Sequence, residues 1–364
     1  MEIRYRDLSV TDTALRARLL ESIDKVLQHG RFILGPEHNE FEERMAAYCG
    51  RQHGIGVNSG TDALFLALKA AGIGEGDEVI TTPLSWIATA NAIVLVGATP
   101  VFADIRYDLN IDPGAIEALI TNRTRAIIPV HFTGQMCEME TIMEIASRHD
   151  LLVIEDGAQA FGAQRNDRVC GSYGTMSCFS MNPMKVYNGY GEAGAIVTDD
   201  AEIREKLTIL RYGGTINKQD CVYPSLNGRL DTIQATMLVI SLDYLEEKIE
   251  KRREIAALYN DRLDNVVRCP RELPGNKHIY YAYSVLADDR DALMSHLAER
   301  GVETQVQHPI PMPRHTAYRD RFDVEIPVAE RAANEILCLP NQEDLIGERE
   351  VDYVTGCIRE FYRL

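Results

Sequence analysis

Four short segments of the sequence carry residues that could together hold and use an aromatic aldehyde. The segment Ser59-Gly60-Thr61 precedes an alanine- and leucine-rich stretch, where a helix would offer free N–H groups to an anion. Trp86 has a flat face that can stack on a ring. Asp156 ends the apolar run VIED and could pair with a cationic ring nitrogen. Lys185 is a candidate nucleophile, because burial or a nearby cation can activate a lysine amine.

Each of these signals also has a plainer interpretation. The serine–glycine–threonine turn could be an ordinary helix cap, and the tryptophan could fill the core. The aspartate could cap a helix or form a salt bridge, and an isolated lysine is usually a solvated surface residue. A phosphate cradle, an aromatic plate, a carboxylate for a ring nitrogen and a lysine for an aldehyde are together the groups that pyridoxal 5′-phosphate requires. The combination therefore predicts a site for that cofactor and no metal site.

The elements that must position these residues alternate between apolar, β-branched runs and helical patterns. Seven strands are expected, and they begin near residues 53, 78, 99, 125, 151, 175 and 194. Helices are expected over residues 61–71, 85–96, 113–120 and 139–149. Such alternation favours an α/β fold with a mostly parallel sheet, covered by helices on both faces, that binds ligands at the carboxyl ends of its strands. The stretch between the last two strands contains Pro183 and several glycines, and we expect functional irregularity there.

The second part of the chain has a different pattern. One long helix is expected over residues 230–263, and it could bridge two domains or contact a partner subunit. Short strands and helices follow from about residue 264. Because 364 residues allow about two domains, we expect a large cofactor-binding domain over residues 1–245 and a small α+β domain over residues 246–364.

Composition and charge exclude several classes of protein. The share of hydrophobic residues, 45%, is that of a globular chain and not of a disordered one. A formal net charge of -17 repels polyanions, so we expect no nucleic-acid partner. A small anionic substrate is still compatible, because local basic side chains can outweigh distant, screened charges. The N-terminus has no signal-like apolar run and no stretch is long enough to span a membrane, which predicts a cytoplasmic protein.

Two other motifs are less informative than their letters indicate. Residues 189–194 read GYGEAG, a literal match to the dinucleotide fingerprint, but that fingerprint requires a following helix and here a strand is expected. NAD binding is therefore not favoured. The eight cysteines are scattered without a CxxC pair, so we expect neither a zinc knuckle nor a disulfide framework.

Several blocks of the sequence, in order, also match a known pattern. These blocks are FILGPEHNEFEERMAAYCG (32–50), NSGTDALFLAL (58–68), GDEVITTPLSWIATANAIVLVGATPVFADI (76–105), VIEDGAQAFGA (153–163), SMNPMKVYNGYGEAGAIVTDD (180–200), NGRLDTIQA (227–235) and GVETQVQHPIPMPRHTAY (301–318). With them the chain resembles the DegT-type sugar aminotransferases. These are pyridoxal-phosphate enzymes of the aspartate aminotransferase fold that act on nucleotide-linked keto-sugars.

The resemblance implies specific roles for the residues around the cofactor ring. Lys185 would form the Schiff base with the cofactor and then carry the proton. Asp156 would pair with the pyridinium nitrogen, Gln159 would lie near the ring oxygen, and Trp86 would stack on the ring.

The resemblance also implies a homodimer with shared active sites. Gly60, Thr61 and Ser180 would hold the phosphate group. Asn227 would reach the phosphate of the neighbouring subunit's cofactor, and Arg229 is a further candidate beside it and for substrate binding.

The reaction implied by the resemblance has two halves, in which an amino donor, L-glutamate, gives its amine and a nucleotide-linked keto-sugar takes it. Gly191 follows Lys185 by six positions, a spacing that is similar to members acting at C3 of the hexose. His308 and Tyr318 are candidate sugar contacts. The alternatives are a 4-keto-sugar aminotransferase, a dehydratase of the same fold and, from another class, a non-catalytic metabolite-sensing regulator. Lys185 argues against the dehydratase, because those relatives carry histidine there.

Overall fold

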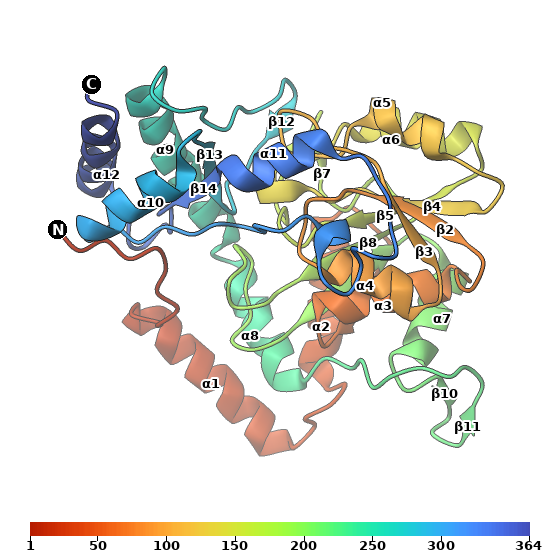
Figure 1. Ribbon diagram of the computed structural model, residues 1–364. Helices are drawn as coiled ribbons and strands as arrows, with labels where there is room; N and C mark the ends of the chain where they lie inside the picture. Colours follow the sequence, from red (N-terminus) through yellow and green to blue (C-terminus); the bar gives the residue numbers. More distant parts are fainter.

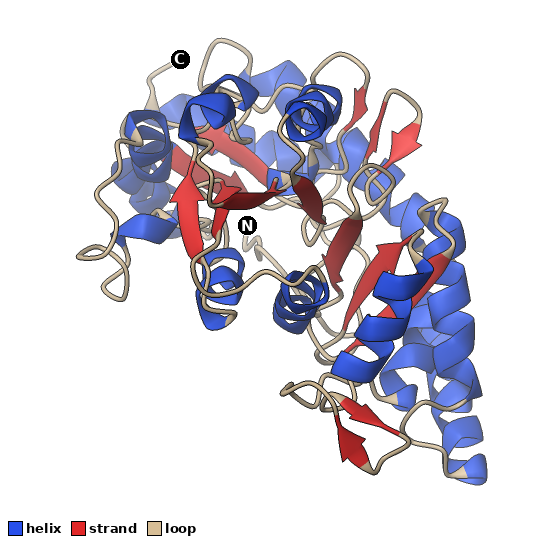
Figure 2. Ribbon diagram, turned by 90° about the vertical axis from the view of Figure 1, so that its right-hand side faces the viewer, coloured by secondary structure: helices blue, strands red, loops and turns tan.

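The centre of the molecule is a seven-stranded sheet, which Figures 1 and 2 show among its helices. The computed structural model describes all of residues 1–364. The strands, in sheet order, are β1 (His53–Val57), β9 (Gly194–Thr198), β8 (Met176–Ser180), β5 (Leu152–Asp156), β4 (Thr124–Ile128), β2 (Glu78–Thr81) and β3 (Thr99–Phe102). All neighbours from β8 to β3 pair in parallel, whereas β9 is antiparallel to both β1 and β8. The prediction of seven strands in a mostly parallel sheet is confirmed.

Helices cover both faces of this sheet. They are α2 (Pro36–Tyr48), α3 (Gly60–Ala70), α4 (Ala88–Leu95), α5 (Pro113–Ile116), α6 (Met139–Arg148) and α7 (Ala201–Leu210). The four predicted helices are present, and two of them are shorter than expected. Residues 82–87 form a loop ahead of α4, and a 3-10 turn over Glu117–Leu119 follows α5.

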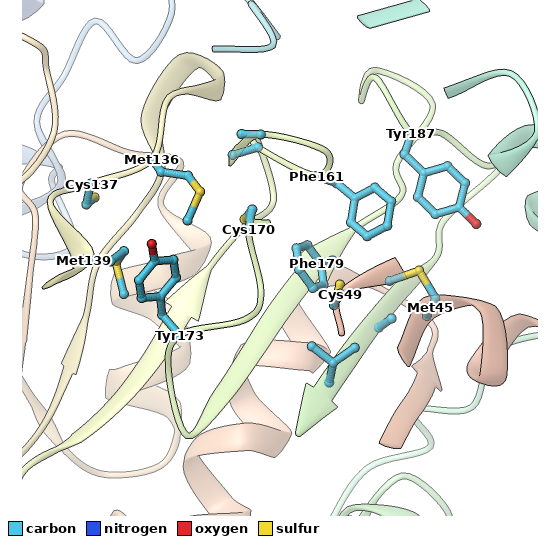
Figure 3. Packing of buried hydrophobic residues seen from close by; sticks show 14 of the residues in the cluster. Met45, Cys49, Met136, Cys137, Met139, Phe161, Cys170, Tyr173, Phe179 and Tyr187 are labelled. Carbon is cyan, nitrogen blue, oxygen red and sulfur yellow. The ribbon is translucent and has the colours of Figure 1, made fainter. Parts of the chain in front are cut away.

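Successive residues of each central strand enter opposite hydrophobic cores, as expected for a sheet buried on both faces. Val153 and Phe179 belong to one buried cluster, and their neighbours Ile154 and Cys178 belong to the other. Figure 3 shows the first cluster, in which the rings of Phe161 and Phe179 pack edge to face with centroids 5.1 Å apart. These two cores pack on opposite faces of the sheet and hold its strands, including their ends, in place.

The prediction of one long helix over residues 230–263 is wrong. Two helices are present, α8 (Thr232–Leu242) and α9 (Leu245–Leu263). At the corner the N–H groups of Asp243 and Tyr244 bond to carbonyl oxygens three residues earlier, which ends the α-helical ladder. The carboxylate of Asp243 accepts hydrogen bonds from Arg18 at 2.8 Å and Arg44 at 2.7 Å, so the corner is fixed by charged contacts that no helical periodicity reports.

A smaller part with its own core contains the C-terminal elements. They are α10 (Arg290–Glu299), α11 (Pro327–Glu335), α12 (Glu348–Phe361) and the antiparallel pair β13 (Tyr283–Leu286) and β14 (Ile336–Leu339). The second half of α9 packs into this core, and so does Ile3 from the start of the chain. The N–H of Ile3 bonds to the carbonyl oxygen of Gly301 at 2.8 Å, and Figure 1 shows the N-terminus beside α10. The expected division at residue 245 stays a prediction.

The remaining elements are peripheral. They are α1 (Thr13–His29), the three-stranded sheet of β6 (Gln164–Arg165), β7 (Arg168–Val169) and β12 (Asn276–Lys277), the hairpin of β10 (Thr215–Ile216) and β11 (Asp220–Cys221), and 3-10 turns at Phe132–Gly134 and Met312–Arg314. Figure 1 shows α1 lying along the outside of the molecule and the β10–β11 hairpin projecting from it. No helix in the chain has both the length and the apolar character needed to cross a bilayer.

The direction of β9 explains how the sheet builds a site. β1, β2, β5 and β8 all end at one edge, whereas β9 begins there because it runs the opposite way. The connection over residues 181–193 therefore crosses this edge with Lys185 in it. The GYGEAG segment leads into β9 and not into a helix, so it lacks the helix N-terminus that a dinucleotide pyrophosphate needs.

Candidate active site

A cavity of about 630 Å³ lies at the carboxyl edge of the sheet, between the large and small parts of the molecule. The sequence-predicted residues that line it are Gly60, Thr61, Trp86, Asp156, Gln159, Ser180, Lys185 and His308. The fold thus brings together residues from four strand ends, the loop before β9 and one segment of the C-terminal part. Three further candidates, Asn227, Arg229 and Tyr318, are not in its lining.

The amino end of α3 forms an anion cradle on one wall. The hydroxyl of Ser59 caps the helix by accepting the N–H of Asp62 at 3.0 Å. The N–H groups of Gly60 and Thr61 have no carbonyl partner within the helix, because they lie in its first turn. A Cβ at residue 60 would lie 2.6 Å from the Cβ of Ser180, so only glycine lets Ser180 approach the helix end this closely. The turn at residues 59–61 therefore both caps the helix and forms the anion cradle.

Asp156 ends β5 and is only 4% exposed. One carboxylate oxygen accepts the hydroxyl hydrogen of Thr89 at 2.8 Å, and the other accepts the N–H of Ala158 at 3.2 Å. Burial raises the pKa of Asp156, and these two hydrogen bonds and the charge of Lys185 oppose that rise only in part. A cationic ring nitrogen beside the carboxylate would stabilise its ionised form against the effect of burial, so the site fits a pyridinium.

The adjacent carboxylate, Glu155, has a different role because it points into the interior. It accepts hydrogen bonds from the N–H groups of Tyr173 and Gly174, from the hydroxyl of Ser177 and from the ring of His131, at 2.7–3.1 Å. Burial alone would raise the pKa of Glu155, but the hydrogen bond and charge of His131 and the other donors lower it to about 2. Glu155 therefore anchors the end of β5 on which Asp156 stands.

Lys185 lies in a tight turn, in which its N–H bonds to the carbonyl oxygen of Asn182 at 2.9 Å. Its Nζ lies 4.7 Å from the centroid of the Tyr281 ring. Burial raises the pKa of Tyr281, but the charges of Lys185 and Arg6 outweigh it, and the pKa falls below its usual value. The lysine amine is thus held over an aromatic surface inside the cavity, where it can reach a carbonyl carbon or a proton.

Gln159 is oriented by its own hydrogen bonds. Its side-chain oxygen accepts the N–H of Thr133 and the amide hydrogen of Gln307, each at 3.0 Å. With the oxygen occupied, the amide NH2 group remains to donate to a ring oxygen in the cavity.

Trp86 and His308 also line the cavity, with ring centroids 6.0 Å apart. Trp86 is 61% exposed, so a face of its ring is free to stack on another ring. His308 has a positive φ of 54°, a strained conformation for a residue other than glycine, and its buried Nε2 has no partner. Burial, followed by the charges of Lys185 and His315, lowers the pKa of His308 to about 3, so the ring is neutral.

The structure places the other three candidates elsewhere. Asn227 is exposed and accepts the Nε hydrogen of Arg229 at 2.7 Å, and that guanidinium lies 4.4 Å from the centroid of the Tyr212 ring. Tyr318 is buried in the cluster that includes Phe132, and its hydroxyl donates to the side chain of Asn91. Tyr318 therefore lies behind the cavity wall.

Residues that sequence reasoning missed also line the cavity. Arg6 and Tyr5 enter it from the N-terminal segment, Tyr281 comes from the C-terminal part, and Thr89 comes from α4. No spacing in the sequence connects these residues to the lysine, because each is brought in by tertiary packing. The pair of basic residues in MEIRYRDL is the only local signal that could have been noted.

These groups match the chemistry of pyridoxal phosphate in three independent ways. A helix end and two hydroxyl residues fit a phosphate, a buried carboxylate without a cationic partner fits the ring nitrogen, and Lys185 fits the aldehyde. Gln159 and Trp86 lie where they could contact the rest of the ring.

Comparison with known proteins agrees with this geometry. The model of the DegT/DnrJ/EryC1/StrS aminotransferase family matches residues 13–359. The chain is 40% identical to the "Pleiotropic regulatory protein" of Geobacillus stearothermophilus over 370 residues, which covers 100% of this chain and 99% of the relative. It is 38% identical to the dTDP-3-amino-3,6-dideoxy-alpha-D-galactopyranose transaminase of Aneurinibacillus thermoaerophilus over 361 residues, 99% of each chain.

The fold is also shared with solved structures. The crystal structure of DesV from S. venezuelae superimposes with a TM-score of 0.96 at 37% identity, and the match covers 100% of this chain and 99% of that one. The chain belongs to the DegT/DnrJ/EryC1/StrS aminotransferase family, whose cofactor is pyridoxal 5′-phosphate.

Proposed function

We propose that this protein transfers an amino group from L-glutamate to C3 of a nucleotide-linked keto-hexose. The observation that carries the proposal is one cavity in which Lys185, Asp156 and the amino end of α3 meet. When bound there, pyridoxal phosphate supplies an aldehyde for the amine and an electron-withdrawing ring.

The chain's own residues then have separable tasks. Lys185 holds and moves the proton at its Nζ, because no other amine lines the cavity. Asp156 keeps a positive charge on the ring nitrogen, and Thr89 and Ala158 hold its carboxylate in place. The helix end at Gly60 and Thr61, with Ser180, fixes the phosphate and therefore the ring. The histidine at 308 is neutral and can exchange hydrogen bonds with a sugar hydroxyl.

Amination at C3 is supported by two independent observations. The name of the Aneurinibacillus relative specifies a 3-amino sugar. The spacing of six positions from Lys185 to Gly191 resembles that of family members acting at C3. Amination of a 4-keto sugar is the alternative, and the assay described below distinguishes the two.

A homodimer with shared active sites is part of the proposal. The pair of Asn227 and Arg229 has no place in its own cavity, and Asn227 is exposed and hydrogen-bonded to Arg229. Exposed apolar side chains accompany α1, the segment after it and the β10–β11 hairpin; they are Leu20, Leu27, Phe32, Ile33, Ile216, Val222 and Tyr223. Such surfaces fit contacts with a second copy of the chain.

The cysteines are all free thiols, which supports a reducing, cytoplasmic location.

A second candidate, a metabolite-sensing regulator, is supported by the name of the Geobacillus relative. Against it stands the complete set of reactive groups at one place, since a sensor needs binding residues but not a lysine held over the cavity. The two functions give different results in one experiment.

The experiment is a transamination assay with matched substrates. The holoenzyme is incubated with L-glutamate and with nucleotide-linked 3-keto or 4-keto hexoses, and the amino sugar and 2-oxoglutarate are measured by mass spectrometry. We expect stoichiometric formation of both products with the 3-keto sugar. Turnover of only the 4-keto sugar would place the amination at C4 instead of C3. Binding of the keto-sugar without formation of either product would favour the regulator.

A further inference from the structure

We propose that Arg6 binds a carboxylate of the amino donor. The proposal deepens the proposed function and rests on it, because it assumes that an amino acid supplies the amine. Arg6 lies outside the sequence motifs that predicted the site.

The cavity needs a fixed positive charge for such a donor. A net charge of -17 repels anions, and Asp156 and Glu192 add two carboxylates to the lining. Arg6 is the only arginine in the lining, and the only lysine there is the reactive one. His308 is neutral. Arg6 is therefore the guanidinium available to receive a carboxylate inside this subunit's cavity.

The guanidinium of Arg6 has N–H donors that the chain itself does not satisfy. Its Nη1 donates to the carbonyl oxygen of Met184, the residue before Lys185. Its Nε is buried without a partner, and Arg6 takes part in none of the ion pairs of the chain. The Nη2 of Arg6 makes no hydrogen bond within the chain, so a ligand carboxylate can bind that nitrogen with a charge-assisted bond.

The guanidinium is also held in place. Its carbon lies 5.5 Å from the ring centroid of Tyr5 and 5.7 Å from that of Tyr281. The same Tyr281 ring lies 4.7 Å from the Nζ of Lys185, so both cations contact one aromatic surface. A donor bound to Arg6 would thus have its amine close to the reactive lysine.

The backbone on both sides of Arg6 is fixed to the C-terminal part. The N–H of Tyr5 donates to Glu303 at 3.0 Å. The N–H of Asp7 donates to the side chain of Gln342 at 2.9 Å, and Gln342 donates back to the carbonyl oxygen of Asp7 at 2.7 Å. This three-residue segment is preorganised, which reduces the entropy lost when a ligand binds.

The test combines a binding and a kinetic measurement on the holoenzyme. Glutarate, a dicarboxylate without an amine, is titrated calorimetrically into wild type, Arg6→Gln, Arg6→Lys and Arg4→Gln. Arg4 is the matched control, because it is two residues away and its side chain is 62% exposed. We expect Arg6→Gln to weaken glutarate binding about 10- to 100-fold, Arg6→Lys to weaken it less, and Arg4→Gln to leave it unchanged.

The kinetic measurement separates carboxylate binding from a structural role. The half-reaction with L-glutamate is compared with the reverse half-reaction from the nucleotide-linked amino sugar. We expect Arg6→Gln to raise the KM for glutamate and to impair the amino-sugar half-reaction much less, because the sugar-side amine is reached without this carboxylate contact. Equal losses in both half-reactions, or unchanged glutarate binding, would overturn the proposal.

The outcomes also separate this proposal from the proposed function. If wild type does not react with glutamate at all, the proposed function fails. If wild type reacts normally and Arg6→Gln binds glutarate equally well, only the role of Arg6 fails. Should Arg6→Gln not fold, Arg6→Lys decides, because loss of the planar two-point contact must weaken glutarate binding selectively.

Discussion

Replacing Asp156 by asparagine should have opposite effects on the apoprotein and on the holoenzyme. In the apoprotein the carboxyl group is buried, and burial raises its pKa above the ordinary value of 3.8. Folding therefore favours the protonated form of the Asp156 carboxyl group. The stability that this group contributes is present at low pH and is lost as the pH rises through its folded-state pKa.

Asparagine has nearly the same shape as aspartate and cannot ionise. Asp156→Asn therefore removes the loss of folding stability that ionisation of Asp156 causes at neutral pH. We expect the apoprotein variant to melt at a higher temperature than wild type at pH 7, and we expect the difference to shrink near pH 4. In the holoenzyme the carboxylate faces a cationic ring nitrogen. Breaking a buried charge pair costs about 3 kcal/mol or more, which corresponds to a rate loss of at least about 100-fold.

The two effects are measured separately. Thermal unfolding of the cofactor-free variant is followed across pH, and the half-reaction with L-glutamate is followed by stopped-flow absorbance. Thr89→Val is the graded control, because it removes only the hydroxyl that donates to Asp156 at 2.8 Å, and we expect a loss of about 1 kcal/mol in the half-reaction. If Asp156→Asn destabilises the apoprotein at pH 7, or reacts at the wild-type rate, the electrostatic argument is refuted.

Three other experiments test the framework of the site. Glu155→Gln should lower stability at neutral pH by roughly 3 kcal/mol, because a pKa of about 2 adds stability above pH 4.5 that is lost as the pH falls; unchanged denaturant unfolding would contradict this. Gly60→Ala should weaken cofactor binding, measured by fluorescence titration, because its Cβ would lie 2.6 Å from Ser180; wild-type affinity would argue against the cradle. Mixing inactive Asn227→Ala and Lys185→Ala subunits should restore one intact site per heterodimer, whereas mixtures with no recovered turnover would oppose shared sites.

The sequence predicted those parts of the structure that depend on local patterns. The apolar runs gave the seven strands, and because strand ends meet at one edge, Asp156, Ser180 and the Ser59–Thr61 segment could be placed together. The order of the strands and the reversed direction of β9 could not be obtained, because they depend on which strands pair at long range.

Interactions between distant residues account for the remaining differences. The break at Asp243 depends on arginines from α1 and α2, which no periodicity in residues 230–263 contains. Arg6 reaches the site through a contact with Met184, 178 residues away in the chain. Tyr318 has a suitable position in the sequence but lies in a hydrophobic cluster, bonded to Asn91.

The central claim is that Lys185 carries the cofactor. The most direct measurement is to reduce the coloured holoenzyme with borohydride, digest it, and locate the pyridoxyl group by mass spectrometry. We expect a single modified peptide with the label on Lys185, and no label after the enzyme has first been converted with L-glutamate. A label on another lysine, or a purified protein that neither absorbs in the visible nor binds added pyridoxal phosphate, would contradict the account.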